Sequence, residues 1–230
     1  MNDLAQNLIE ELQCETVFTI PVLGGIPVSE AVVVTWIIMA VLVVIAFILT
    51  RNLKVDHISK RQAVAESIVT GLLNMVQGMV GEKGKAYVPY LTTVMLYIGV
   101  SNIIGLFGFK SPTKDLRVTV ALALMSIILI EAAGIYHKGV KRWLHGFVEP
   151  VAIVTPINIL EVVTKPLSLC MRLFGNVLGA FVIMELLKMI LPVGLPVVFS
   201  LYFDIFDGLL QAYVFVFLTS LSVSYTHLTL

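Results

Sequence analysis

Long apolar segments dominate the pattern of hydrophobic and polar positions along the chain. They cover residues 31–50, 87–109, 118–136, 151–191 and 195–221. Each is long enough to cross the hydrocarbon layer of a membrane, because a helix of about 20 residues spans its roughly 30 Å. The pattern predicts an all-α, polytopic membrane protein with about five transmembrane helices. The last two are long and tilted, and the fourth could also kink at Pro156 and Pro166.

Residues 58–80 show a different pattern, in which apolar side chains recur at helical spacing and polar ones fill the rest of the wheel. Val64, Ile68, Leu72 and Met79 mark the apolar side. We interpret this segment as an amphipathic helix on the cytoplasmic interface, with a sixth span as the alternative. No repeat and no boundary of a soluble domain is visible, so residues 31–230 form one membrane domain after an N-terminal tail of residues 1–30.

The composition agrees with a membrane protein, since 58% of the residues are apolar, only 13% are charged and the mean hydropathy is +0.98. Fifteen basic residues balance fifteen acidic ones, so nothing indicates a nucleic-acid partner. Cys14 and Cys170 lie far apart and suggest neither a disulfide framework nor a metal site. With no phosphate loop, catalytic triad or metal motif, we expect no cofactor, no metal and no catalysis on this chain.

The basic residues predict the orientation in the membrane. The connections after the first and third spans together hold nine Lys or Arg, the connection after the second holds three, and residues 1–30 hold none. By the positive-inside rule the N-terminal tail lies outside and the first and third connections lie in the cytoplasm. Five crossings then leave the C-terminus in the cytoplasm.

The fourth apolar segment carries polar and charged side chains that are costly inside a membrane, about 2.5–3.5 kcal/mol each at a helix centre. On a helical wheel they fall within about 40° of one line. This polar stripe consists of Glu161, Lys165, Ser168, Arg172, Asn176 and Gly179. The opposite side carries side chains suited to lipid or to an apolar neighbour: Val163, Met171, Phe174, Phe181 and Leu187.

Arg172 lies near the middle of this segment, where snorkelling to an interface is difficult. Its guanidinium keeps its proton, so it cannot relay protons, but it can attract a mobile carboxylate and repel a passing proton. A structural ion pair with another helix is the alternative. Glu185 and Lys188 lie three residues apart and away from the stripe, which predicts a local ion pair near the external end.

The fifth segment has a polar face of its own. Asp204, Asp207, Gly208 and Gln211 stand at i, i+3, i+4 and i+7, which places them on one side of a helix. Facing the polar stripe, this side could order a file of water through which protons hop. The alternative is a polar helix–helix contact. We favour the water path for Asp204 and Gln211 and leave Asp207 open.

Three stretches carry a family resemblance. Pro156-Ile-Asn-Ile-Leu-Glu161 with Lys165-Pro-Leu-Ser-Leu-Cys-Met-Arg172-Leu-Phe-Gly-Asn176, and the later Leu210-Gln211-Ala-Tyr-Val-Phe-Val-Phe-Leu-Thr219, strongly resemble the signature of the a subunit of F-type ATP synthases. Pro89-Tyr-Leu-Thr-Thr with Ser101-Asn-Ile-Ile-Gly-Leu106 is similar to the second span of that family. The resemblance covers about residues 85–220.

The resemblance implies a stator subunit of the bacterial cell membrane, against which a ring of c subunits rotates. Its partners would be that ring, the peripheral-stalk b subunits, the remainder of the complex and the lipid bilayer. The arginine matching Arg172 would face the carboxylate of each passing c subunit and separate two aqueous half-channels for protons. Ion-translocation residues would be Arg172, Asn176, Asp204, Gln211, Glu161 and Ser168, followed by Asp207, Lys165 and Glu185.

The chain also departs from that family. Members often carry a carboxylate nine residues after the arginine, where this sequence has Phe181, paired with a histidine where it has Asp204. We take Asp204 as the ionisable group of the external half-channel and Glu161 as that of the cytoplasmic one. The Ser- and Thr-rich ending, residues 222–230, matches the family poorly and receives no role.

Two other classes of protein are alternative hypotheses to the stator subunit. An independent secondary transporter could use Arg172 to bind an anionic substrate, but such proteins commonly have two related halves, and none are visible here. A membrane scaffold would leave the buried charges unexplained.

Overall fold

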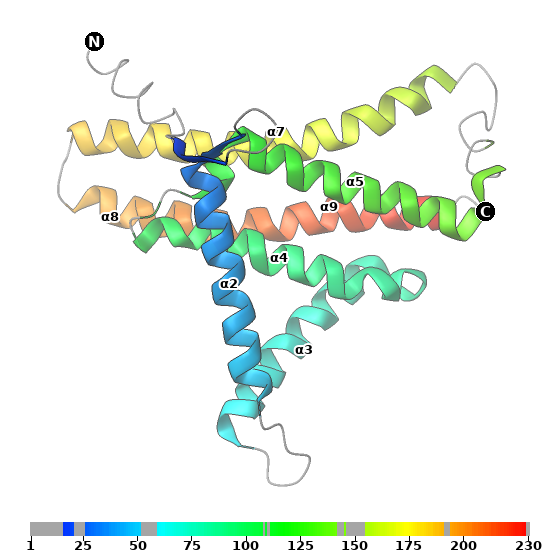
Figure 1. The fold of residues 1–230 in the computed structure, drawn as a ribbon, viewed down its shortest axis with the longest axis horizontal. Helices are drawn as coiled ribbons and strands as arrows, with labels where there is room; N and C mark the ends of the chain where they lie inside the picture. The colour runs from blue at the N-terminus through cyan, green and yellow to red at the C-terminus, as the bar shows by residue number, and fades with distance from the viewer. Residues whose placement is uncertain are drawn as a thin grey trace.

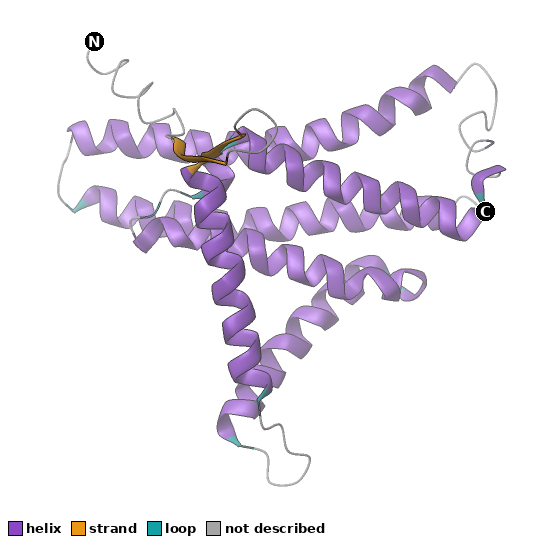
Figure 2. Cartoon of the chain, in the orientation of Figure 1, coloured by secondary structure: helices purple, strands orange, loops and turns teal. Residues whose placement is uncertain are grey.

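The computed structural model describes residues 16–20, 26–51, 59–107, 109, 111–141, 145, 155–190 and 194–228. Its long elements are α2 (Glu30–Thr50), α3 (Lys60–Val80), α4 (Val88–Ile103), α5 (Leu116–Lys138), α7 (Thr155–Ile190), α8 (Leu195–Ser200) and α9 (Gly208–Leu228). Between them lie the 3-10 turns η1 (Glu82–Tyr87), η2 (Ile104–Phe107) and η3 (Pro112–Lys114), and the π-helical stretch η5 (Leu201–Asp207). Helices dominate the described part (Figure 2), which confirms the all-α prediction.

Four helices, α4, α5, α7 and α9, run side by side, and α2 crosses them steeply (Figure 1). Because α2 and this bundle point in such different directions, they cannot all stand upright in one bilayer. If α2 crosses the membrane along its normal, the helices of the bundle must therefore be tilted. The sequence predicts such a tilt for the fourth and fifth spans. Within the bundle α9 packs along α4 and α7 packs along α5, whereas α7 and α9 touch over a short stretch only.

Five helical stretches of the described residues are long and apolar enough to cross a membrane: Glu30–Thr50, Lys60–Val80, Gly84–Phe107, Thr155–Met189 and Pro196–Val223. The 23 residues of α5 have the length of a span as well. The stretch in α3 has the lowest mean hydropathy of the five, 1.3 against 3.2 in α2. Its position on the interface stays a prediction.

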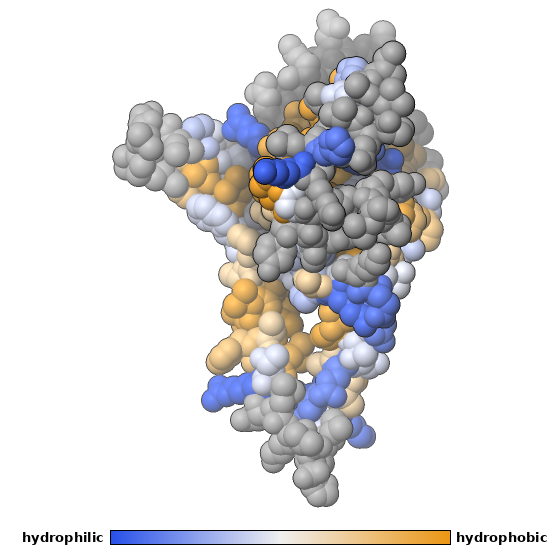
Figure 3. All heavy atoms as spheres, turned by 90° about the vertical axis from the view of Figure 1, so that its right-hand side faces the viewer, coloured by the Kyte–Doolittle hydropathy of each residue, from blue (hydrophilic) through white to orange (hydrophobic). Residues whose placement is uncertain are grey.

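The core of the bundle is apolar and closely packed around α9. Val76 of α3, Leu91 and Ile98 of α4, and Leu173 of α7 are almost fully buried with Phe215 of α9. By contrast, most of α2 beyond its first turns exposes apolar side chains. Figure 3 shows such side chains in orange along the narrow lower part of the molecule, with hydrophilic ones in blue below them. This exposure is what a lipid-facing helix requires.

A short β-hairpin precedes the first span and was not predicted. Strand β1 (Thr16–Ile20) pairs antiparallel with β2 (Ile26–Ser29), and Phe18 lies opposite Val28. Ser29 ends the hairpin and donates a hydrogen bond from its hydroxyl to the Asp115 carboxylate at 3.0 Å. Asp115 also caps α5, since its other oxygen accepts the Arg117 backbone N–H at 2.9 Å. The hairpin is thereby fixed to the turn between α4 and α5.

Helix α7 is 36 residues long, about 54 Å at the rise of an α-helix, and it contains Pro166. Proline cannot donate the helical hydrogen bond and crowds the preceding turn. Accordingly, the first part of α7, yellow-green in Figure 1, is turned away from the rest. Pro156, the other expected kink site, is the second residue of the helix, where proline is well tolerated.

Candidate functional site: two polar cavities along helix α7

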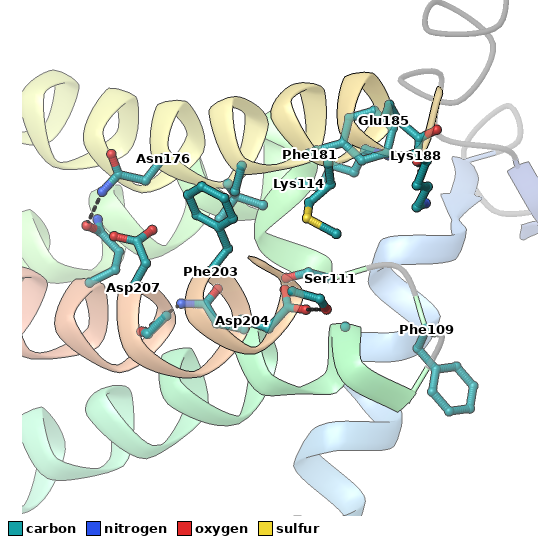
Figure 4. Close-up of a pocket in the computed structure, with 18 residues that line it drawn as sticks. Phe109, Ser111, Lys114, Asn176, Phe181, Glu185, Lys188, Phe203, Asp204 and Asp207 are labelled. Carbon is teal, nitrogen blue, oxygen red and sulfur yellow. Dashed lines mark hydrogen bonds and ion pairs between the residues drawn. The ribbon is translucent and has the colours of Figure 1, made fainter. Parts of the chain in front are cut away.

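The first cavity lies between the second half of α7 and the start of the last helix. It has a volume of about 360 Å³, and η2 and η3 complete its wall. We call it the outer cavity, because the η3 turn belongs to the connection that the positive-inside rule predicts to lie outside the membrane. Among the predicted site residues it is lined by Asn176, Glu185, Asp204, Asp207 and Gln211. In Figure 4 the two aspartates lie on the helix opposite Asn176 and Glu185.

The second cavity lies between the first half of α7 and the last turns of α9. Its volume is about 240 Å³, and Leu169, Leu218, Leu221 and Ser222 complete the wall. We call it the inner cavity. The remaining predicted site residues line it: Glu161, Lys165, Ser168 and Arg172. The structure thus brings each of the nine predicted residues to the wall of one cavity or the other.

A hydrogen bond between two amides crosses from α7 to α9 where the cavities approach each other. The Asn176 Nδ2 donates to Gln211 Oε1 at 2.6 Å, shown dashed in Figure 4. Arg172 precedes Asn176 by one helical turn and lines the inner cavity, while the amide pair lines the outer one. The amide pair and Arg172 therefore lie at the boundary between the two polar spaces.

Gln211 is nearly fully buried, and its Nε2 has no hydrogen-bond partner within the described part of the chain. A buried amide donor without a partner is unfavourable by about 1–3 kcal/mol. Sites that keep such a donor commonly present it to water or to a ligand. The side chain of Arg172, one turn before Asn176 on α7, is exposed.

Asp204 is held at the outer cavity by neighbours on two sides. Ser200, one turn earlier, donates its hydroxyl to the Asp204 carboxylate at 2.7 Å. On the other side a Cβ added to Gly105 would lie 3.2 Å from Asp204 Oδ1, so the carboxylate lies close against the η2 backbone. Both aspartates belong to the π-helical stretch η5, a type of helix that is rare and often found at functional sites.

The prediction that Phe181 faces lipid or an apolar neighbour is wrong. Phe181 lines the outer cavity, and the Lys114 Nζ lies 3.2 Å from the centre of its ring. The reason is geometric: α7 bends and passes α9 at an angle, so the side of α7 that faces α9 changes along its length. Up to Asn176 that side is the polar stripe, and beyond it the cavity is lined by Val177, Ala180, Phe181 and Met184.

Two local ion pairs accompany the cavities. The predicted pair of Glu185 with Lys188 is confirmed, with Nζ and Oε1 2.6 Å apart, and both side chains line the outer cavity. In the inner cavity Lys165 Nζ lies 2.9 Å from Glu161 Oε1, an unpredicted pair that the i, i+4 spacing allows. In each pair the positive and the negative charge offset each other.

Three further residues of the outer cavity were missed in the sequence. Asn102 donates to the Gly208 carbonyl at 3.0 Å and accepts the Thr113 hydroxyl at 2.8 Å, which joins α4, α9 and η3. Ser200 stands four residues before Asp204, and this spacing could have revealed it. Lys114 was counted only as a loop charge, and no local pattern ties it to α7.

No cluster of three or more His, Cys, Asp or Glu side chains suited to a metal ion occurs among the described residues. His57, His137 and His227 carried no prediction of metal binding, and His145 lies exposed. The site is consequently built of amides, carboxylates, hydroxyls and one guanidinium, together with lysines. Such groups can hold water, exchange protons and bind a carboxylate.

Comparison with known proteins gives one consistent result. A family model described as ATP synthase A chain matches residues 32–224. ATP synthase subunit a of Moorella thermoacetica is 35% identical over 86% of this chain and 90% of its own length. ATP synthase subunit a 2 of Acaryochloris marina is 30% identical over 87% of this chain and 86% of its own length.

A third relative is named as sodium ion specific. The ATP synthase subunit a of Propionigenium modestum is 34% identical over 85% of this chain and 73% of its own length. The matched segment of the family model includes both cavities and the helices that form them. The chain is therefore a multi-pass membrane protein that belongs to the ATP synthase A chain family.

Proposed function

We propose that this chain is the proton-translocating stator subunit a of an F-type ATP synthase. In this role the outer and inner cavities serve as two half-channels that do not join. A proton enters one, neutralises a carboxylate on a ring of c subunits, travels with the ring and leaves through the other. The observation that carries the proposal is the pair of separate polar cavities, with Arg172 and the Asn176–Gln211 bond at their boundary.

Arg172 supplies the charge that this cycle needs. A guanidinium that stays protonated favours the ionised form of a carboxylate that reaches it, so the ring carboxylate releases its proton there. The same positive charge repels a proton moving directly from one cavity to the other. Because Arg172 is exposed in the isolated chain, a ring subunit can approach it from the side. The Nε2 of Gln211, which has no partner among the described residues, can then donate to water in the outer cavity.

Each cavity has its own ionisable group in this scheme. Asp204, supported by Asp207, exchanges protons in the outer cavity. Glu161 does so in the inner cavity, where Lys165 and Ser168 lie beside it. Moving one charge through 100 mV releases about 2.3 kcal/mol, which is the energy that turns the ring.

The proposal includes the surroundings of the chain. The chain lies in a bacterial inner membrane, with its N-terminal tail on the outer side and its C-terminus in the cytoplasm. The c ring, the b subunits and the rest of the complex are the partners, and the nucleotide chemistry takes place on other subunits. Family membership favours this stator over the independent secondary transporter.

The test uses the complete complex in membrane vesicles. Arg172→Ala should abolish ATP synthesis driven by an imposed proton gradient, because the ring carboxylate then loses the charge that deprotonates it. Arg117→Ala is the matched control, since this exposed arginine at the start of α5 lines neither cavity and should keep the wild-type rate. Coupled synthesis that persists in Arg172→Ala contradicts the proposal.

A further inference from the structure

Ser29, at the end of the β-hairpin, uses its side chain in an unusual way. It is the N-cap residue of α2, a position at which serine commonly accepts a backbone N–H of its own helix. Ser29 makes no such bond, and its hydroxyl donates instead to Asp115 Oδ2 at 3.0 Å, 86 positions later in the sequence. Both residues are almost fully buried. The hydroxyl therefore serves a contact between distant parts of the chain rather than the end of its own helix.

Asp115 joins the η3 turn to helix α5. Its backbone N–H donates to the Pro112 carbonyl at 3.1 Å and closes the turn, while its Oδ1 accepts the Arg117 N–H at 2.9 Å and caps the helix. Because Oδ2 accepts the Ser29 hydroxyl, both carboxylate oxygens are occupied. A hydrogen bond to a charged group is stronger than one between neutral groups. Asp115 is thus the point at which the hairpin holds the turn.

The turn held in this way forms part of the wall of the outer cavity. Ser111 and Lys114 line the cavity, and the Lys114 Nζ lies 3.2 Å from the centre of the Phe181 ring on α7 (Figure 4). On its other side the turn is joined to α4, since the Thr113 hydroxyl donates to Asn102 Oδ1 at 2.8 Å. The η3 turn therefore connects α4 with α7 at the outer cavity.

The segment that holds the turn lies outside the part of the chain that matches the family model. That match begins at residue 32, after the hairpin and Ser29, whereas Asp115 and the residues that line both cavities lie within it. The buried residues of α2 are also confined to the end next to the hairpin: Ala31, Val34 and Ile38. The hairpin and the first turns of α2 thus form one attachment to the bundle, and this attachment includes the η3 turn.

We propose that the N-terminal hairpin positions the wall of the outer cavity, with Ser29 as a positioning residue that acts through Asp115 and the η3 turn. Without the Ser29 hydroxyl, a buried carboxylate oxygen loses its donor. The turn then shifts outward until water replaces that donor, and the cavity opens on this side. The role of this cavity as a half-channel for protons rests on the function proposed above.

The experiment measures how fast a water-soluble methanethiosulfonate reagent modifies a cysteine in each cavity of the complete complex in membranes. Cys14 and Cys170 are first replaced by alanine, so that no native thiol of this chain reacts. Met184→Cys then reports on the outer cavity and Leu221→Cys on the inner cavity. The reagent reacts with the thiolate, which forms only where water reaches the side chain. Modification of this chain is followed by mass spectrometry.

Ser29→Ala should make the reaction at position 184 about tenfold faster and leave the reaction at position 221 unchanged. Tenfold is the shift expected in a local opening equilibrium when one hydrogen bond to a carboxylate is lost. Ser29→Thr keeps the hydroxyl and should react at the wild-type rate in both cavities. Thr50→Ala is the matched control, because it removes a hydroxyl from the other end of α2, where Thr50 donates to the Ala46 carbonyl at 2.7 Å. It should change neither rate.

Unchanged modification at position 184 in Ser29→Ala would overturn the proposal, because the hydroxyl would then anchor only the N-terminal segment. Equal acceleration in both cavities would overturn it as well, since the hydroxyl would then support the fold as a whole. In complexes with the native cysteines, Ser29→Ala should lose part of its proton-driven ATP synthesis and Ser29→Thr should keep it. A full rate in Ser29→Ala contradicts the link to the half-channel.

Failure of the proposed function would look different. The modification rates need no ATP synthesis, so they test the positioning of the cavity wall by themselves. Arg172→Ala that retains proton-driven synthesis would contradict the stator function and leave the difference between the two cavities as it is.

Discussion

The two sides of α9 are built in opposite ways. Toward α4 the helix is closely packed: Leu91 and Ile98 meet Phe215, all nearly inaccessible, and the Gly208 carbonyl accepts a hydrogen bond from Asn102. Toward α7 the same helix makes few contacts, and two polar cavities lie along the gap. A space for water between helices is stable only where neighbouring surfaces hold the helices in place. The packed side of α9 therefore maintains the open one.

The difference separates two kinds of mutational effect. Changes on the packed side should reduce the amount or the stability of the assembled complex. Changes on the open side should leave assembly intact and reduce proton-driven ATP synthesis, because the cavity walls contribute little packing.

On the packed side the largest effect should come from Gly208→Ala. A Cβ at Gly208 would lie 2.7 Å from the Asn102 Cβ, too close for either helix to keep its position. Overpacking of this kind destabilises by about 1–3 kcal/mol. We expect a lower thermal midpoint of the purified complex and less of it in the membrane.

Gly71→Ala in α3 is the matched control, since a Cβ there meets nothing within 4 Å. Both substitutions bring the same gain in helix propensity, about 0.8–1.0 kcal/mol. If the two variants are equally stable, α4 and α9 are not in the tight contact described.

Asp204→Asn, on the open side, should slow proton entry without changing assembly. Removing a group that exchanges protons typically reduces a rate by about 10²–10⁴-fold, and Asp207 in the same cavity limits the loss to about tenfold. ATP synthesis is measured as a function of pH on the proton-supplying side. Asp207→Asn removes the same charge from the same wall and should have the smaller effect. A wild-type rate for Asp204→Asn at every pH rejects the relay.

How far the sequence predicts this site depends on whether a feature is local. The polar stripe with Arg172 and the face with Asp204 and Gln211 were found from helical periodicity, because each lies within one helix. Lys114 and Phe181 were not brought together, since their contact depends on how α7 crosses a turn about 70 residues earlier in the sequence. The β-hairpin was missed for a similar reason: its attachment to Asp115 is a contact across 86 positions.

Asn176→Leu tests the boundary between the cavities. The variant removes the donor to Gln211 Oε1, and water in the outer cavity can take its place. We expect ATP synthesis to fall about fivefold, with normal amounts of complex. Asn176→Gln, which keeps an amide, should retain more activity than Asn176→Leu. Equal loss in both variants would mean that side-chain length rather than the hydrogen bond matters.

The smallest effect should come from Ser200→Ala. The variant removes the hydroxyl that donates to Asp204 at 2.7 Å, and a bond of this kind contributes about 1 kcal/mol or less when water can replace it. Water from the cavity can reach the carboxylate, so we expect about a twofold lower rate and unchanged stability. In the Asp204→Asn background Ser200→Ala should have no further effect on the rate, because the hydroxyl acts only through that carboxylate. An additional loss in that background would show that Ser200 also supports the packing of η5. The boundary between the packed and open sides of the last helix would then lie within η5.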